Sequence, residues 1–313
     1  MGDETMMNKA LVRPAMIVIP LVLGIFLPQG ARLGFLADPL LIGMLFAVFL
    51  QLELRELAPR PTHWVILATN LAIGVGAYLL ALSTGSRELA LAAFFIGITP
   101  TATAAPVIMN LLNGRVGFVV SGFVVTNLGV SLALIPLIPA VTGQFTVAFA
   151  LRVLRNLLVV MALPLVAAQL LRRFHPAAAQ WPKRYKMVSL AMWSALLFIV
   201  SAKASKFLRG NTGTSLWLVA EIALAAALLC AANFTIGAFV VPKKFRREGS
   251  QTLGQKNTML TMSLALSFAS PLAALGPTFY VICHNFWNAC QLFMFDRRRS
   301  RRAAKNAEAP EKG

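Results

Sequence analysis

Two clusters of polar residues lie inside apolar segments of this chain, and each combines ligand-type side chains with residues that break a helix. The first is Thr99-Pro100-Thr101-Ala102-Thr103-Ala104-Ala105-Pro106, within the apolar run 89–112. Each proline removes a backbone donor and clashes with the carbonyl group one turn earlier, so we expect a broken helix. Thr101 and Thr103 can then line a polar cavity. The alternative is a kinked but closed helix whose threonines bond to their own preceding turn.

The second cluster is Gly254-Gln255-Lys256-Asn257, within the apolar run 250–270. Gly254 permits the chain to unwind, which brings three polar side chains to one point. A lysine well inside the hydrocarbon core of a bilayer costs about 2.5–3.5 kcal/mol on insertion scales. Lys256 is therefore expected to face a polar cavity. The alternative is that its ammonium group reaches back to the membrane surface.

Three more polar residues belong to the candidate site. His284 and Asn285 stand near the middle of the apolar run 276–295, and Asn127 follows the first cluster closely enough to reach the same cavity. A single histidine or asparagine in such a run often only hydrogen-bonds a neighbouring helix. Because His284 and Asn285 are adjacent, we interpret them as candidate ligands.

The composition indicates that lipid surrounds the elements that position these residues. The chain has 313 residues, of which 58% are hydrophobic and 13% charged, whereas soluble proteins carry about 25% charged residues. The net charge of +18 comes from basic residues in short connections between apolar runs, which is typical of membrane topology and excludes a nucleic-acid partner. We expect the basic residues of the tail to lie against anionic headgroups of the inner leaflet; they are Arg297, Arg298, Arg299, Arg301 and Arg302.

Ten apolar runs approach the roughly 20 residues that cross a bilayer, so the predicted fold is an all-α integral membrane protein. The predicted spans are 11–28, 34–54, 63–83, 89–112, 116–140, 146–171, 185–207, 214–241, 250–270 and 276–295. They form two five-helix sets, in residues 1–140 and 141–296, followed by a disordered basic tail, 297–313. Because five is odd, the two sets enter the membrane from opposite sides as inverted repeats. The two breaks fall in the fourth helix of each set, which marks a substrate site near mid-bilayer.

The orientation follows from the basic residues. Most Lys and Arg residues fall in connections on one side of the predicted membrane, and this side is cytoplasmic by the positive-inside rule. We therefore expect a multi-pass protein of the inner (plasma) membrane with both termini in the cytoplasm.

Three patches of the chain resemble the bile acid:sodium symporter family. The family pattern Cys/Ser-Pro-Gly-Gly-x-Ala-Ser-Asn-Val is similar to 99–107, and Glu-x-Gly-x-Gln-Asn-x-x-Leu is similar to 252–260. The pattern Ser-Pro-Leu-Ala-Ala-Leu…His-Asn is the closest, at 270–275 and 284–285. The resemblance implies a ten-helix fold whose fourth and ninth helices unwind and cross. It also places substrate contacts at Asn257, His284 and Asn285.

The chain departs from the family at the positions that would bind sodium. Where the family has a Ser-Asn pair, a Glu and a Gln, this chain has Ala105, Pro106, Thr252 and Lys256. A hard cation requires oxygen ligands and negative charge, and two positive charges about 4 Å apart repel by roughly 4 kcal/mol at an effective dielectric of 20. We therefore expect Lys256 to replace the cation and hold the crossover together, so that transport does not depend on sodium. Proton coupling through Lys256 is a variant of this hypothesis.

Together these features predict a secondary active transporter that carries an organic anion by alternating access. Two broken-helix N-termini, Lys256 and the threonines Thr101 and Thr103 favour an anion. A bile acid and a small carboxylate such as pantoate or a 2-oxo acid fit the sequence equally well.

Two alternative transporters remain. A sodium-coupled bile acid symporter would use the remaining oxygen ligands, with Gln255 and Asn127 among the ion-site positions. An arsenite or auxin-type carrier has a related fold, although an arsenite carrier would be expected to have a cysteine where Thr99 stands. The sequence shows no motif of a metalloprotease, a serine hydrolase or a phosphate-binding loop, so we predict neither an enzyme nor a cofactor.

Overall fold

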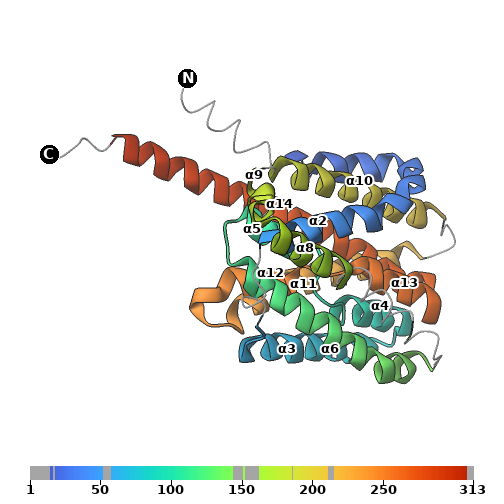
Figure 1. Cartoon of the computed structure of the whole chain (residues 1–313). Coiled ribbons are helices and arrows are strands. Elements are labelled where there is room, and N and C mark those ends of the chain that lie inside the picture. The colour runs from blue at the N-terminus through green and yellow to red at the C-terminus, as the bar shows by residue number, and fades with distance from the viewer. Residues whose placement is uncertain are drawn as a thin grey trace.

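A computed structural model describes residues 15–16, 18–51, 58–143, 151, 162–184, 186–210 and 215–308. The described residues are helical and contain no strand, which confirms the all-α prediction (Figure 1). In chain order the labelled elements are η1 (Pro28–Leu36), α2 (Ala37–Gln51), α3 (Pro61–Leu82), α4 (Arg87–Gly97), α5 (Ala105–Leu111), α6 (Val116–Thr142), α8 (Leu163–Phe174), η4 (Pro176–Gln180), α9 (Trp181–Arg184), α10 (Lys186–Gly210), α11 (Leu216–Phe239), η5 (Lys243–Phe245), α12 (Arg246–Gly254), α13 (Thr258–Phe268) and α14 (Pro271–Glu308).

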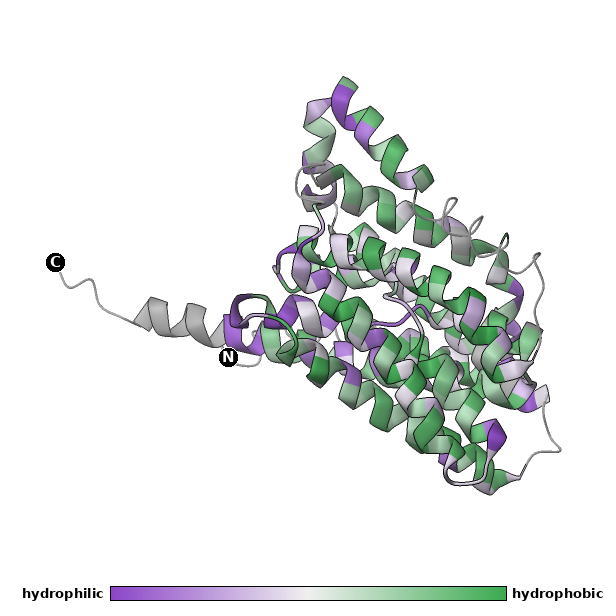
Figure 2. Ribbon diagram, turned by 90° about the horizontal axis from the view of Figure 1, so that it is seen from below, coloured by the Kyte–Doolittle hydropathy of each residue, from purple (hydrophilic) through white to green (hydrophobic). Residues whose placement is uncertain are grey.

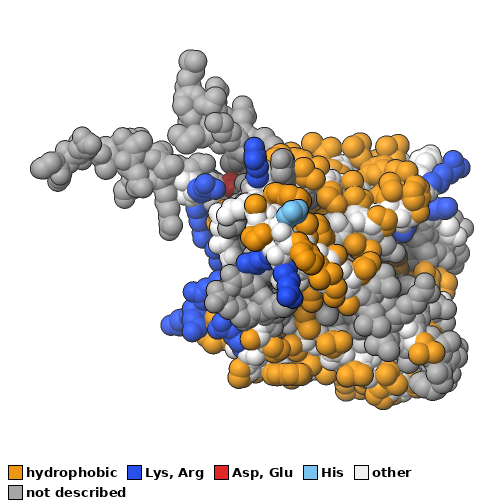
Figure 3. Space-filling model, in the orientation of Figure 1, with side chains coloured by type: hydrophobic (Ala, Val, Ile, Leu, Met, Phe, Trp, Pro, Cys, Tyr) orange, Lys and Arg blue, Asp and Glu red, His pale blue; other side chains and the backbone are white. Residues whose placement is uncertain are grey.

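The helices have the length and surface of a membrane protein. Among the described residues, α3, α6 and α11 are long and apolar enough to cross a bilayer, and the bent pair Val18–Phe26 and Pro28–Leu36 makes a fourth candidate. In Figure 2, hydrophobic residues, coloured green, occupy much of the length of most helices. They also cover much of the face shown in Figure 3, where Lys and Arg side chains lie mainly toward its two ends. Large apolar side chains are exposed, such as Leu216 (85%) and Trp217 (74%).

Both predicted breaks are present in the structure. The run 89–112 divides into α4 and α5, and the run 250–270 divides into α12 and α13. Pro106 lies in the first turn of α5, where its missing N–H group has no intrahelical acceptor to lose. The alternative of a kinked but closed helix is therefore wrong for the first break.

Glycine pairs bring each broken helix against the helix before it. A Cβ atom on Gly97 of α4 would lie 2.7 Å from Gly74 Cα of α3, and one on Gly237 of α11 would lie 2.5 Å from the Gly249 carbonyl oxygen of α12. Small residues allow such close backbone approach between helices in membranes. The helix that precedes each break thus packs on the first half of the broken helix in both parts of the chain.

The helices form two groups on either side of α14 (Figure 1). One group contains α2, α8, α10 and η1, in which α2 contacts each of the other three, and the other group contains α3, α4, α6, α11 and α12. Helix α14 contacts α4, α11 and α13, and also α10 of the first group. The first halves of both broken helices, α4 and α12, therefore belong to the second group.

Several predicted boundaries differ from the structure. Residues 29–33, predicted to be a connection, belong to the 3₁₀ helix η1, which bends by 118° from Val18–Phe26. The boundary predicted between the two five-helix sets, at residue 140, falls inside the last turn of α6. This helix ends at Thr142, and the residue that follows it, Gly143, has a left-handed backbone conformation. Most of the predicted span 146–171 lies outside the described residues.

The prediction that the tail is disordered is wrong as far as Glu308, because α14 continues to that residue. Ala, Arg, Lys and Glu have high helix propensity, and extending an existing helix avoids the cost of nucleation.

Candidate functional site

The two breaks cross and complete each other's backbone hydrogen bonds. Ala102 N donates to the Gln255 carbonyl oxygen at 2.8 Å, and Asn257 N donates to the Pro100 carbonyl oxygen at 2.9 Å. The two segments form a single antiparallel bridge at this point. Backbone groups freed by a break must find partners where water is excluded, so each break provides what the other lacks.

Lys256 lies inside the crossing rather than at the membrane surface. Its side chain is 1% exposed. Its Nζ donates to Asn70 Oδ1 and, at 3.2 Å, to the Gly97 carbonyl oxygen at the end of α4. The carbonyl end of a helix carries a partial negative charge, which stabilises a cation. The alternative in which the ammonium group reaches the surface is therefore wrong.

Thr101 and Asn127 hold the crossing and are not among the described residues that line the cavity beside it. Thr101 Oγ1 donates to the Thr252 carbonyl oxygen at 2.5 Å and accepts from Thr126 Oγ1 at 2.8 Å. Asn127 Nδ2 donates to the Thr101 carbonyl oxygen at 2.9 Å. All four side chains are buried, so this network ties α6 and α12 to the first break.

A cavity of about 150 Å³ lies between the crossing and the group of helices that contains α10. Five of the six predicted substrate residues line it, and Thr101 is the exception. These five are Thr103, Lys256, Asn257, His284 and Asn285. The opposite wall consists mainly of apolar residues of α10, together with Gly34, Ala37 and Lys203.

His284 and Asn285 line this cavity, and each has a buried polar atom without a partner in the described part of the chain. Their side chains are 3% and 2% exposed, and neither His284 Nδ1 nor Asn285 Oδ1 has a hydrogen-bond partner among the described residues. Asn285 Nδ2 donates to the Val281 carbonyl oxygen at 2.7 Å. Leaving a buried polar atom unpaired costs about 1–3 kcal/mol, so a polar ligand that reached these two atoms would recover this free energy.

Lys203 of α10 is a site residue that the sequence interpretation missed. It lines the cavity and donates from Nζ to the Gly34 carbonyl oxygen at 3.3 Å. A Cβ atom on Gly34 would lie 2.7 Å from Lys203 Nζ, so the lysine side chain lies directly across this glycine. Its position within the predicted span 185–207 is the signal in the sequence that could have identified it.

The remaining ion-site positions have protein partners or no side-chain oxygen. Ala105 and Pro106 begin α5, and neither side chain contains an oxygen atom. Thr252 Oγ1 donates to the Glu248 carbonyl oxygen at 2.7 Å. Gln255 Oε1 accepts from Asn288 Nδ2 at 2.6 Å.

The site is thus a small cavity beside two crossed breaks, with cationic and hydrogen-bonding side chains among the apolar residues of its walls. Comparison with known protein families finds no family model that matches the chain, and comparison with curated proteins finds no match.

Proposed function

We propose that this protein is a secondary transporter that carries an organic anion by alternating access. The observation that carries this proposal is the cavity beside the crossing, whose ionisable lining side chains are Lys203, Lys256 and His284, with no carboxylate among the described lining residues. A membrane-embedded cavity with cationic walls stabilises a negatively charged solute. Its position between two groups of helices suits a site that opens to either side in turn.

In this proposal the chain has ten spans in two inverted five-helix repeats, and α4–α5 and α12–α13 are the broken fourth helices. The matching glycine contacts of α3 with α4 and of α11 with α12 support the repeat. The resemblance of three patches to the bile acid:sodium symporter family points to the same architecture.

The size of the cavity favours a small carboxylate over a bile acid. A volume of about 150 Å³ is below the roughly 300–1,000 Å³ of pockets that hold drug-sized ligands. Pantoate or a 2-oxo acid suits this space better than a steroid. Asn285 Oδ1 would accept a hydrogen bond from a hydroxyl group of such a solute, and His284 Nδ1, when it carries the imidazole proton, would donate to a carbonyl group.

We assign the carboxylate of the solute to Lys203. The ammonium group of Lys256 already binds Asn70 and the Gly97 carbonyl, whereas Lys203 donates to Gly34 at 3.3 Å. A charge-assisted bond to a carboxylate is stronger than this longer bond to a neutral carbonyl. Lys203 would therefore leave Gly34 for the solute.

The site does not fit a sodium ion. Sodium prefers several oxygen ligands, but Ala105 and Pro106 provide none and the Lys256 ammonium lies at the end of α4. We propose that Lys256 is a permanent substitute for the coupling cation and that transport is independent of sodium.

Uptake of radiolabelled pantoate into proteoliposomes tests the proposal. We expect uptake at the same rate with a sodium or a potassium gradient, and a separate proton gradient tests the variant in which Lys256 couples protons. Lys203→Met is expected to raise the KM for pantoate about 10- to 100-fold, because it removes one charge-assisted hydrogen bond to the solute. Lys206→Met, an exposed lysine on the same helix, is the matched control.

Gly34→Ala gives an independent check on Lys203. The added methyl group would displace the lysine Nζ while keeping its charge, so the KM should rise as in Lys203→Met. Pantoate uptake that strictly requires sodium, or a KM unaffected by both substitutions, would contradict the assignments made here.

A further inference from the structure

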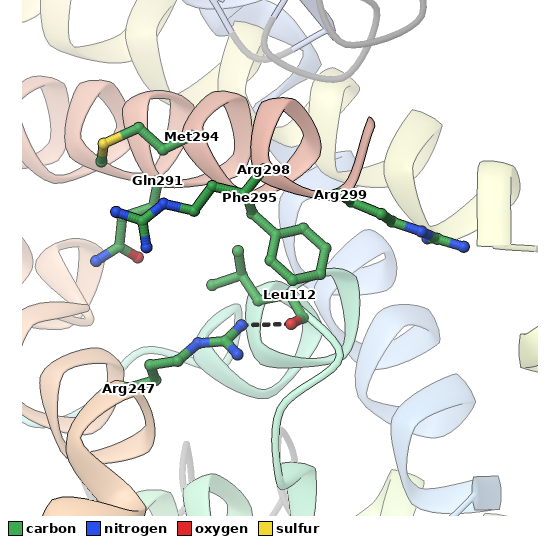
Figure 4. Close-up of a pocket in the computed structure, with 7 residues that line it drawn as sticks. All are labelled: Leu112, Arg247, Gln291, Met294, Phe295, Arg298 and Arg299. Carbon is green, nitrogen blue, oxygen red and sulfur yellow. Dashed lines mark hydrogen bonds between the residues drawn. The ribbon is translucent and has the colours of Figure 1, made fainter. Parts of the chain in front are cut away.

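A second, larger pocket lies at the end of the molecule from which α14 projects. Its volume is about 490 Å³, and it is bounded by Leu112 after α5, the first turn of α12 and the middle of α14 (Figure 4). This volume is within the usual range for small-molecule sites. It is separate from the cavity beside the crossing, because the two have no lining residue in common.

The walls of this pocket combine positive charge with apolar surface. Arg247 donates from Nη2 to the Leu112 carbonyl oxygen, and its guanidinium carbon lies 5.4 Å from the centre of the Phe295 ring. Figure 4 shows Arg298 reaching toward the pocket from the other side, next to Gln291, while Arg299 points away. No acidic side chain is among the described residues that line the pocket. An anion attached to an apolar body matches these walls.

Four amide side chains connect this pocket to the crossing. Gln291 lines the pocket, and its Oε1 accepts from Gln251 Nε2 at 2.6 Å. Gln251 Nε2 also donates to Asn288 Oδ1 at 3.1 Å, and Asn288 Nδ2 donates to Gln255 Oε1 at 2.6 Å. Gln255 lines the inner cavity. Gln251 is 1% exposed, and its Oε1 has no hydrogen-bond partner among the described residues.

We propose that the pocket at Arg247, Arg298 and Phe295 binds an organic anion with an apolar body, and that the amide series Gln291–Gln251–Asn288–Gln255 is the polar route between this pocket and the inner cavity. The route rests on the proposed transport function, whereas the anion site does not. An acidic phospholipid headgroup presents the same chemistry. The amide series, however, leads from the pocket into the interior of the protein, where a membrane lipid does not go. A soluble carboxylate can bind in the pocket and also follow the amide series inward.

Thiol labelling tests the anion site without any transport. In protein with Cys230, Cys283 and Cys290 replaced by alanine, Met294→Cys places a thiol in the pocket wall, outside the amide series. The measurement is the rate of modification by the anionic sulfonatoethyl and the cationic trimethylammonioethyl methanethiosulfonates. Arg247→Gln or Arg298→Gln should each lower the anionic-to-cationic rate ratio about fivefold, the effect of one nearby charge. The matched controls are Arg246→Gln and Arg297→Gln, sequence neighbours that do not line the pocket.

Octanoate, an amphipathic carboxylate, is the probe for occupancy. In nanodiscs of phosphatidylcholine we expect octanoate to slow labelling and octyltrimethylammonium to leave it unchanged. Protection by phosphatidylglycerol in the bilayer, without protection by octanoate, would assign the pocket to lipid and overturn the soluble ligand. A rate ratio that ignores Arg247 and Arg298 would overturn the anion site itself.

Gln251→Leu tests the route separately. We expect pantoate flux in proteoliposomes to fall at least about tenfold, while octanoate protection in the Met294→Cys background is unchanged. Unchanged flux would overturn the route and leave the pocket standing. Absence of flux in the unsubstituted protein would instead contradict the proposed function, and the labelling result would still decide the anion site.

Discussion

Among single residues, Lys256 has the most unusual environment, because a 1% exposed ammonium group must be compensated within the protein. Asn70 Oδ1, the Gly97 carbonyl oxygen and the negative end of α4 provide this compensation. Asn70 Nδ2 also donates to the Ile98 carbonyl oxygen at 3.0 Å, so the asparagine fixes the end of α4 and the lysine together. Asn70 was not among the residues that we predicted for the site.

A double-mutant cycle measures this pair. Lys256→Met and Asn70→Ala should each destabilise the protein, because each leaves a buried polar partner unsatisfied, and their coupling energy should be about 1–3 kcal/mol. The measurement is the free energy of unfolding in detergent. Lys206→Met, at an exposed position, should stay within about 0.5 kcal/mol of the unsubstituted protein. Strictly additive effects would show that the two side chains do not interact.

At the level of the helices, the positions of the two breaks depend on close backbone contacts of α3 with α4 and of α11 with α12. A Cβ atom on Gly74 would lie 2.8 Å from Ile98 Cα, at the point where α4 ends and the first break begins. The neighbour is backbone, which cannot rotate away as a flexible side chain can. Any widening here would move Gly97, whose carbonyl oxygen binds Lys256.

Gly74→Ala and Gly76→Ala separate this contact from helix propensity. Both glycines lie in α3, but a Cβ atom on Gly76 meets nothing within 4 Å. We expect Gly74→Ala to destabilise the protein by about 1–3 kcal/mol through overpacking. Gly76→Ala should be neutral or slightly stabilising, because alanine has the higher helix propensity. Thermal unfolding in detergent provides the comparison, and equal melting temperatures would contradict the close contact.

At the scale of the whole molecule, the distribution of charge accounts for the proposed orientation. The connection before α12 contains Lys243 and Lys244, whereas the connection between α3 and α4 consists of Ser83, Thr84, Gly85 and Ser86, with a single basic residue, Arg87, after it. These segments lie at opposite ends of the proposed bilayer. The positive-inside rule then assigns the first segment to the cytoplasm.

Labelling of intact cells tests this orientation. In the cysteine-free background, Ser83→Cys should react with a membrane-impermeant maleimide added from outside, because its turn is proposed to be external. Lys244→Cys should react only after the membrane is permeabilised. Both positions are exposed in the structure, so accessibility within the protein does not differ. The reverse pattern would invert the topology, and the pocket at Arg247 would then face outward.

The helical class, the apolar helices and the places where two of them break follow from the sequence alone. These features are local: proline and glycine act on their own turn, and an apolar run is read from neighbouring residues. The sequence also predicted five residues that line the cavity, because polar side chains are costly in lipid and therefore stand out in an apolar run. These residues are Thr103, Lys256, Asn257, His284 and Asn285.

Which polar groups line the cavity and which hold the crossing depends on how the helices pack together. Thr101 and Thr103 are two residues apart, yet Thr101 bonds to the Thr252 carbonyl and only Thr103 lines the cavity. Lys203 belongs to the site because α10 places it across Gly34, which is distant in the chain. The direction of a side chain at a break depends on the partners that other segments bring to it, and these partners are set by packing between helices rather than by the residues alongside.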